Sequence, residues 1–95
     1  MKIGTAIKNT RVEKGLSQGE LAKMIEISPT SLSQIENNIK TPSSSSLKKI
    51  SSSLKVPEVY FYLISLEKDD VPEDKKNLYD LMYPSITEMV KKLVI

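Results

Sequence analysis

The sequence has no cysteine, no histidine and no tryptophan among its 95 residues. Without cysteine there can be neither a disulfide framework nor a thiolate metal site. The serines show no nucleophile-elbow pattern, and the three glycines form no phosphate-binding loop. These absences make an enzyme the least expected class of protein, and we expect neither a cofactor nor a metal.

Acidic residues cluster at Asp69, Asp70, Glu73 and Asp74. The cluster lacks the glycine and the ligand spacing of a calcium loop, so we interpret it as a solvated run of charge rather than a metal site. Long apolar runs are also absent, and no segment approaches the length of a membrane-spanning helix. The first residues lack the apolar stretch of a signal peptide. Together with the absence of cysteine, this predicts a cytoplasmic protein without membrane contact.

The charge of the chain is small but unevenly placed. Residues 1 to 57 carry nine basic and four acidic side chains, which gives +5, and residues 58 to 95 carry five and eight, which gives −3. The two halves add up to the net charge of +2. A basic front half is expected to face a polyanion.

Start and stop signals divide the front half into helices. Gly15 stands where a first helix would end. Ser17 precedes Glu20 by three residues, which is the capping box that begins a second helix. Ser28 followed by Pro29 begins a third, with serine as the N-cap and proline at the first helical position.

The helical pattern continues to about residue 66. Two asparagines at 37 and 38 end the third helix, because asparagine tolerates the left-handed conformation. Pro42 and the serines after it open a fourth helix, which Val56 and Pro57 close. A short aromatic helix, about Val59 to Leu66, completes a unit that we assign to residues 1–66.

A charged segment, residues 67–76, contains Pro72 and is the best candidate for a linker. Residues 77–95 follow as a C-terminal helical extension with an apolar stripe. Pro84 interrupts this stripe, which predicts either two short helices or one kinked helix.

The segment Ser17 to Asn37 resembles the helix-turn-helix of the Xre/Cro family of phage and bacterial repressors. The resemblance extends over about Ile3 to Leu63 and rests on a string of residues in the right order: Arg11, Ser17, Gln18, Leu21, Ala22, Ser28, Ile35, Glu36, Asn37 and Pro42. It implies an all-α fold, a five-helix lambda-repressor-like domain with the helical extension behind it. It also implies a regulator of transcription that binds double-stranded DNA.

Two positions depart from the family pattern. Glu26, in the turn before the third helix, and Asn38, after that helix, stand where the family usually has glycine. We expect a positive φ at both positions. Asparagine adopts this conformation at small cost and glutamate at a larger one.

The resemblance also implies roles for individual residues. The third helix would lie in the major groove with its N-terminal end toward the bases, and its base-contacting residues would be Pro29, Thr30, Ser31, Ser33 and Gln34. Gln34 is the strongest candidate because a carboxamide can pair bidentately with adenine, whereas Pro29 offers only an apolar contact. The expected phosphate contacts are Ser17, Gln18, Asn37, Lys40 and Thr41, although capping is the main role expected of Ser17. Arg11 would form a structural ion pair with Glu36.

We expect a homodimer on a palindromic operator, because one such domain reads few base pairs. The predicted interface uses apolar residues after Val56, namely Tyr60, Phe61, Ile64, Met89 and Leu93. Two alternatives stay open: the aromatic residues could build the core, and the tail could fold back over its own domain. A third is an antitoxin-like protein whose C-terminal segment binds another protein.

Overall fold

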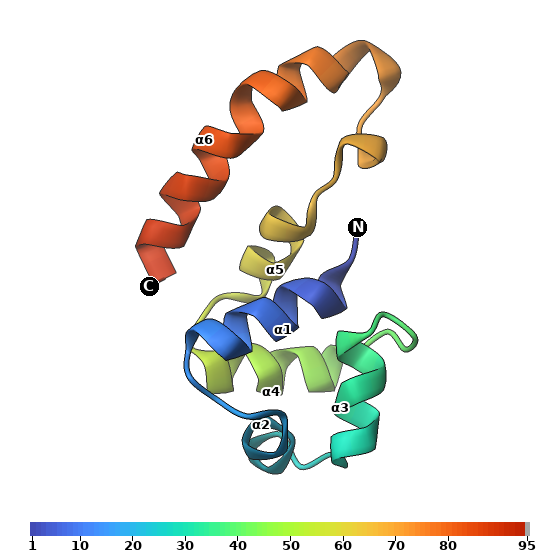
Figure 1. Ribbon diagram of the computed structural model, residues 1–95, viewed down its shortest axis with the longest axis vertical. Coiled ribbons are helices and arrows are strands. Elements are labelled where there is room, and N and C mark those ends of the chain that lie inside the picture. The colour runs from blue at the N-terminus through green and yellow to red at the C-terminus, as the bar shows by residue number, and fades with distance from the viewer. Residues whose placement is uncertain (95) are drawn as a thin grey trace.

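The structure is a computed structural model that describes residues 1–94, and every regular element in that range is helical (Figure 1). The helices are α1 (Ile3–Glu13), α2 (Gln18–Met24), α3 (Pro29–Glu36), α4 (Ser44–Leu54), α5 (Glu58–Ser65) and α6 (Lys76–Val94). Two short 3-10 turns, Lys68–Asp70 and Glu73–Lys75, connect α5 to α6. The predicted all-α fold with a helical extension is therefore confirmed.

Three helices begin with a serine that caps the first turn. Ser17 Oγ accepts a hydrogen bond from the Glu20 N–H at 3.0 Å, and the Glu20 carboxylate accepts one from the Ser17 N–H at 2.9 Å. The predicted capping box is thus present. Ser28 and Ser43 cap α3 and α4 in the same way, each accepting from the backbone three residues later.

The helices α1 to α4 all end in a Schellman motif, with one residue in the left-handed conformation. The four left-handed residues, with their φ angles, are Gly15 (76°), Glu26 (60°), Asn38 (61°) and Lys55 (58°). In each case the N–H of the next residue donates to the carbonyl five positions earlier, at 2.9–3.1 Å. The positive φ predicted for Glu26 and Asn38 is confirmed, and Lys55 is a further case that the sequence did not suggest.

A single apolar core lies inside the five-helix domain. Its largest fully buried side chains are Tyr60, Phe61, Ile7, Leu21, Ile25, Leu32, Ile50 and Leu54. Every one of α1 to α5 contributes to this cluster. The core fixes α3 against α1 and α2, and this contact determines which face of α3 remains exposed.

The C-terminal extension is one helix that continues through Pro84. It folds back over its own domain, and Figure 1 shows its C-terminal end close to the end of α1. The Tyr79 and Tyr83 hydroxyls donate to backbone carbonyls at the end of α5, at 3.0 and 2.8 Å. Lys14 Nζ donates to the Val94 carbonyl at 2.9 Å. The extension is therefore attached by a few contacts along one of its faces.

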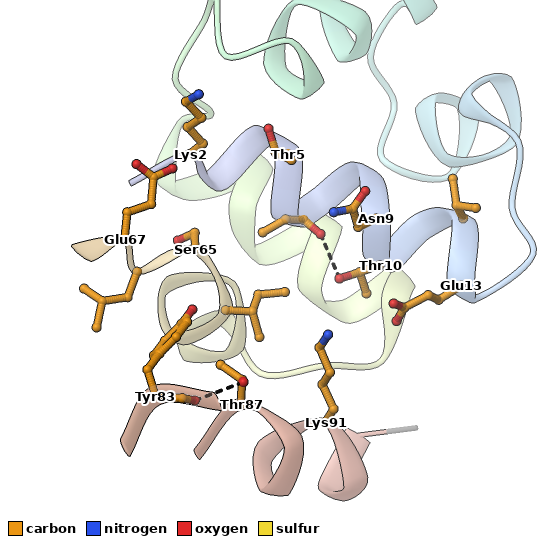
Figure 2. A pocket seen from close by; sticks show the side chains of 14 residues that line it. Lys2, Thr5, Asn9, Thr10, Glu13, Ser65, Glu67, Tyr83, Thr87 and Lys91 are labelled. Carbon is orange, nitrogen blue, oxygen red and sulfur yellow. Dashed lines mark hydrogen bonds between the residues drawn. The ribbon is translucent and has the colours of Figure 1, made fainter. Parts of the chain in front are cut away.

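A groove of about 560 Å³ separates α6 from α1. Figure 2 shows Asn9 and Glu13 of α1 on one wall and Thr87 and Lys91 of α6 on the other. Because this space lies between the two helices, α6 does not bury a face against α1. Among residues 1–94, no helix combines the length and the apolar character that crossing a bilayer requires.

Candidate nucleic-acid interface

The helix α3 turns one face to the core and the opposite face to solvent. Leu32 and Ile35 are buried, whereas Pro29, Thr30 and Gln34 are exposed. The Gln34 side chain makes no hydrogen bond within residues 1–94, although its backbone carbonyl accepts from the loop after α3. Its carboxamide is therefore free to bind a ligand.

Contacts at the edge of α3 bring two groups of predicted DNA-contacting residues together. Lys40 Nζ donates to Ser31 Oγ at 3.3 Å, and Asn37 Nδ2 donates to Ser33 Oγ at 3.3 Å. Ser31 and Ser33 are half-buried, whereas Gln34 is exposed. The ammonium group of Lys40 is thereby held beside the exposed face of α3.

The predicted contact between Arg11 and Glu36 is present and is buried. Arg11 Nε and Nη2 donate to the two carboxylate oxygens of Glu36 at 2.7 and 3.0 Å, and Arg11 Nη1 donates to the Leu16 carbonyl at 2.8 Å. The pair connects the end of α1 to the end of α3. It therefore fixes the orientation of α3 relative to the rest of the domain.

Gln18 lies at the start of α2, but its side chain already has a partner. Its Nε2 donates to Glu36 Oε1 at 3.0 Å, so the carboxamide belongs to the network of Arg11 and Glu36. The second N–H of the amide has no partner within residues 1–94. A phosphate contact from Gln18 would use that N–H and would be coupled to the buried ion pair.

Two residues that position α3 were missed by the sequence reasoning. Asn38 Oδ1 accepts from the Gly4 N–H at 2.9 Å, and its Nδ2 donates to Thr5 Oγ1 at 2.9 Å. A Cβ atom on Gly4 would lie 1.9 Å from the Ile35 carbonyl oxygen, so only glycine fits there. The one available signal was a glycine inside a helical pattern, which often marks a close approach of another backbone.

Comparison with known proteins shows the family to which this helical domain belongs. A family model described as helix-turn-helix matches residues 7–61, which is more than half of the chain. The chain belongs to the Xre-like helix-turn-helix family of transcriptional regulators. Proteins of this family bind double-stranded DNA.

Three similar proteins illustrate the relationship. The HTH-type transcriptional regulator ImmR of Bacillus subtilis is 32% identical over 93 residues, which are 98% of this chain and 68% of ImmR. A crystal structure of a mutant of the restriction-modification controller protein C.Esp1396I has a TM-score of 0.60 and 35% identity, over 66% of this chain and 82% of the controller. PlcR of Bacillus thuringiensis, crystallised with the peptide PapR7 and DNA, has a TM-score of 0.63 and 34% identity. The match with PlcR covers 84% of this chain but only 28% of PlcR.

ImmR is named as a transcriptional regulator and C.Esp1396I as a controller protein, and the polar face of α3 agrees with that class. The capping box of this helix-turn-helix also has an electrostatic consequence. Hydrogen bonds from the Ser17 backbone and side chain hold the pKa of Glu20 below its ordinary value of 4.5. Glu20 is therefore ionised near neutral pH, and its charge lies in the first turn of α2, where the helix dipole favours an anion.

The remaining predicted residues have mixed outcomes. Ser17 and Thr41 are exposed, and Ser17 caps α2 as expected. Of the predicted dimer interface, Ile64 is half-buried, and Met89 and Leu93 are exposed. Tyr60 and Phe61 are 1% and 0% exposed, so their assignment to an interface is corrected: they belong to the core. Their apolar rings pack inward because α5 closes the domain against α1 and α4.

Proposed function

We propose that this protein is a transcriptional regulator of the repressor or controller type that binds a palindromic operator as a homodimer. The observation that carries the proposal is the exposed face of α3. It is polar, it has Lys40 at its edge, and a buried ion pair fixes its orientation. A polar helix face held by its scaffold in this way suits insertion into the major groove.

Sequence would be read by the residues at the N-terminal end and along the outer side of α3. Gln34 presents a free carboxamide, which can accept from N6 and donate to N7 of adenine. Thr30 can hydrogen-bond to a base edge or place its methyl group against that of thymine. Ser31 and Ser33 offer hydroxyls that are held by Lys40 and Asn37, and Pro29 offers an apolar contact. Because α3 carries neither arginine nor lysine, the commonest contact to guanine is missing from it.

Phosphate contacts would fix the register of the domain on the duplex. Lys40 and Thr41 follow α3, Asn37 ends it, and Ser17 and Gln18 stand at the start of α2. Such contacts give affinity without sequence information and make binding fall steeply as salt rises. Gln18 differs from the others because its amide is shared with the ion-pair network, so it links the phosphate contact to the position of α3.

A dimer follows from the size of the domain. One domain of this kind reads only a few base pairs, which is too few to distinguish an operator from the competing sites of a genome. Two copies related by a two-fold axis would place their α3 helices one turn of DNA apart, about 34–36 Å. The operator would then have two inverted half-sites at that spacing.

Selection of binding sites from a random double-stranded DNA library tests this function directly. We expect a motif of two inverted half-sites with adenine or thymine at the position that Gln34 reads. An asymmetric motif, or recovery of DNA without any shared sequence, would contradict the proposal. The same selection with Gln34→Ala is the matched control, and it should lose the preference at that one position.

A further inference from the structure

Lys40 follows α3 in the chain, but its ammonium group lies beside the N-terminal half of that helix. The backbone N–H of Lys40 donates to the Gln34 carbonyl at 3.2 Å, in the turn that ends α3. Its Nζ donates to Ser31 Oγ at 3.3 Å. Ser31 comes about one helical turn before Gln34, so the side chain of Lys40 runs back along α3, from the end of the helix toward its beginning.

The backbone holds the start of this side chain in place. Asn38 has the left-handed conformation, with a φ of 61°, and turns the chain back over the last turn of α3. The N–H groups of Ile39 and Lys40 then donate to one acceptor, the Gln34 carbonyl, at 2.9 and 3.2 Å. The Asn38 side chain is itself bonded to α1. Lys40 therefore extends from a fixed point at the edge of the exposed face of α3.

The charge of Lys40 is not compensated within the domain. Among residues 1–94 its ammonium group forms no ion pair, and its side-chain partner there is the neutral hydroxyl of Ser31. The helix α3 contains a single charged residue, Glu36, which is 2% exposed and bound to Arg11. Lys40 thus brings a positive charge to a helix face that has no charged side chain of its own.

Lys40 and Ser31 together present two hydrogen-bond donors side by side. Because Ser31 Oγ accepts from Lys40, its own proton stays free, and the ammonium group keeps two further N–H groups. The two donor atoms are 3.3 Å apart. In the major groove guanine presents two acceptors, O6 and N7, whereas adenine presents one acceptor and one donor. The pair of donors therefore fits guanine, and the amino group of adenine would oppose one of them.

We propose that Lys40 and Ser31 read a guanine in each half-site, at a second position beside the base that Gln34 reads. This inference rests on the proposed function and changes one assignment in it, since Lys40 contacts a base rather than a phosphate. Ser31 and Gln34 are three residues apart in α3 and share one side of the helix, so both bases lie in the same major groove. Thr41, which is exposed, keeps the phosphate contact of this loop.

Selection of binding sites from a random library separates a base contact from a phosphate contact. The native protein should select inverted half-sites that contain a guanine besides the base read by Gln34. Lys40→Met keeps the length of the side chain but cannot donate, so it should lose the preference for that guanine and keep the other positions. Lys92→Met is the matched control. It removes the same charge from an exposed position of α6, which Figure 1 shows apart from α3, and it should select the native motif.

Affinities for two duplexes at one salt concentration give the size of the effect. One duplex carries the selected half-sites, and in the other an adenine–thymine pair replaces the guanine–cytosine pair at the second position. The native protein should bind the substituted duplex about 5- to 150-fold more weakly. Lys40→Met and Ser31→Ala should each reduce this ratio at least about twofold, because each removes one donor. Lys40 is exposed and Ser31 half-buried, so circular dichroism should show an unchanged fold for both variants.

The outcomes distinguish the inference from the proposed function. If Lys40→Met selects the native motif and only binds more weakly throughout, Lys40 is a phosphate contact and the inference is wrong. Inverted half-sites without a guanine in the native selection would also overturn the inference, while the proposed function would stand. Recovery of DNA without any shared sequence would contradict both.

Discussion

Removing the Glu36 carboxylate should be among the most damaging single substitutions in this protein. Glu36 is 2% exposed and accepts three hydrogen bonds, two from Arg11 and one from Gln18, at 2.7–3.0 Å. Arg11 is 8% exposed, so Glu36→Ala leaves a buried guanidinium whose remaining bond is to the Leu16 carbonyl. Breaking a buried ion pair from one side costs about 3–5 kcal/mol. A domain of this length has a total stability of about 5–14 kcal/mol, so the variant should fold but lose a large share of its stability.

The assay is urea unfolding followed by circular dichroism, applied to Glu36→Ala and to a cycle made of Arg11→Met, Glu36→Leu and their double variant. Replacing both partners by apolar side chains removes the unpaired charge, so the double variant should lose less than the sum of the two single losses. The coupling free energy should be about 1–3 kcal/mol. If Glu36→Ala costs less than about 1 kcal/mol, or if the two single losses are additive, then the ion pair does not hold α3 in its position.

Three further predictions concern the local geometry. Glu26→Gly should stabilise the protein by up to about 1 kcal/mol, because φ is 60° there and glycine adopts that conformation without strain; a lower midpoint in urea would contradict this. Gly4→Ala should cost about 2–4 kcal/mol in the same measurement, because its Cβ would overlap the Ile35 carbonyl; an unchanged midpoint would show that α1 can shift freely. Glu20 should stabilise the protein relative to Glu20→Ala fully above about pH 4.5, and this stabilisation should vanish as the pH falls through the lowered pKa of Glu20 in the folded state. The measurement is the difference in thermal midpoint between the native protein and Glu20→Ala. The same difference at pH 2 and at pH 7 would refute the capping role.

The elements that were predicted correctly are those set by local chemistry. Ser17 with Glu20, and Ser28 with Pro29, mark helix starts because a cap needs only neighbouring residues. The contact between Arg11 and Glu36 was different: it followed from the family resemblance, since two residues 25 positions apart give no local sign of contact. For that pair, the structure supplied the third member of the network, Gln18.

The features that could not be predicted depend on the packing of distant segments. The bond of Asn38 to Gly4 joins residues 34 positions apart, and the glycine inside a helical pattern gives no indication of which residue it contacts. The apolar run around Tyr60 and Phe61 fits a core and an interface equally well, and only the closure of α5 on the domain decides between them. The interruption at Pro84 is a further case: the sequence left two short helices or one kinked helix open, and the structure has a single helix through Pro84.

The central claim, that the exposed face of α3 reads DNA sequence, is tested most directly by a ratio of affinities. The ratio of cognate to random duplex affinity should be measured for the native protein, for Gln34→Ala and for Thr41→Ala at one fixed salt concentration. We predict that Gln34→Ala reduces this ratio by a factor that corresponds to about 1–3 kcal/mol, whereas Thr41→Ala, at an exposed position after α3, weakens binding to both duplexes and leaves the ratio unchanged. A ratio that Gln34→Ala leaves unchanged would show that α3 is not the reading surface.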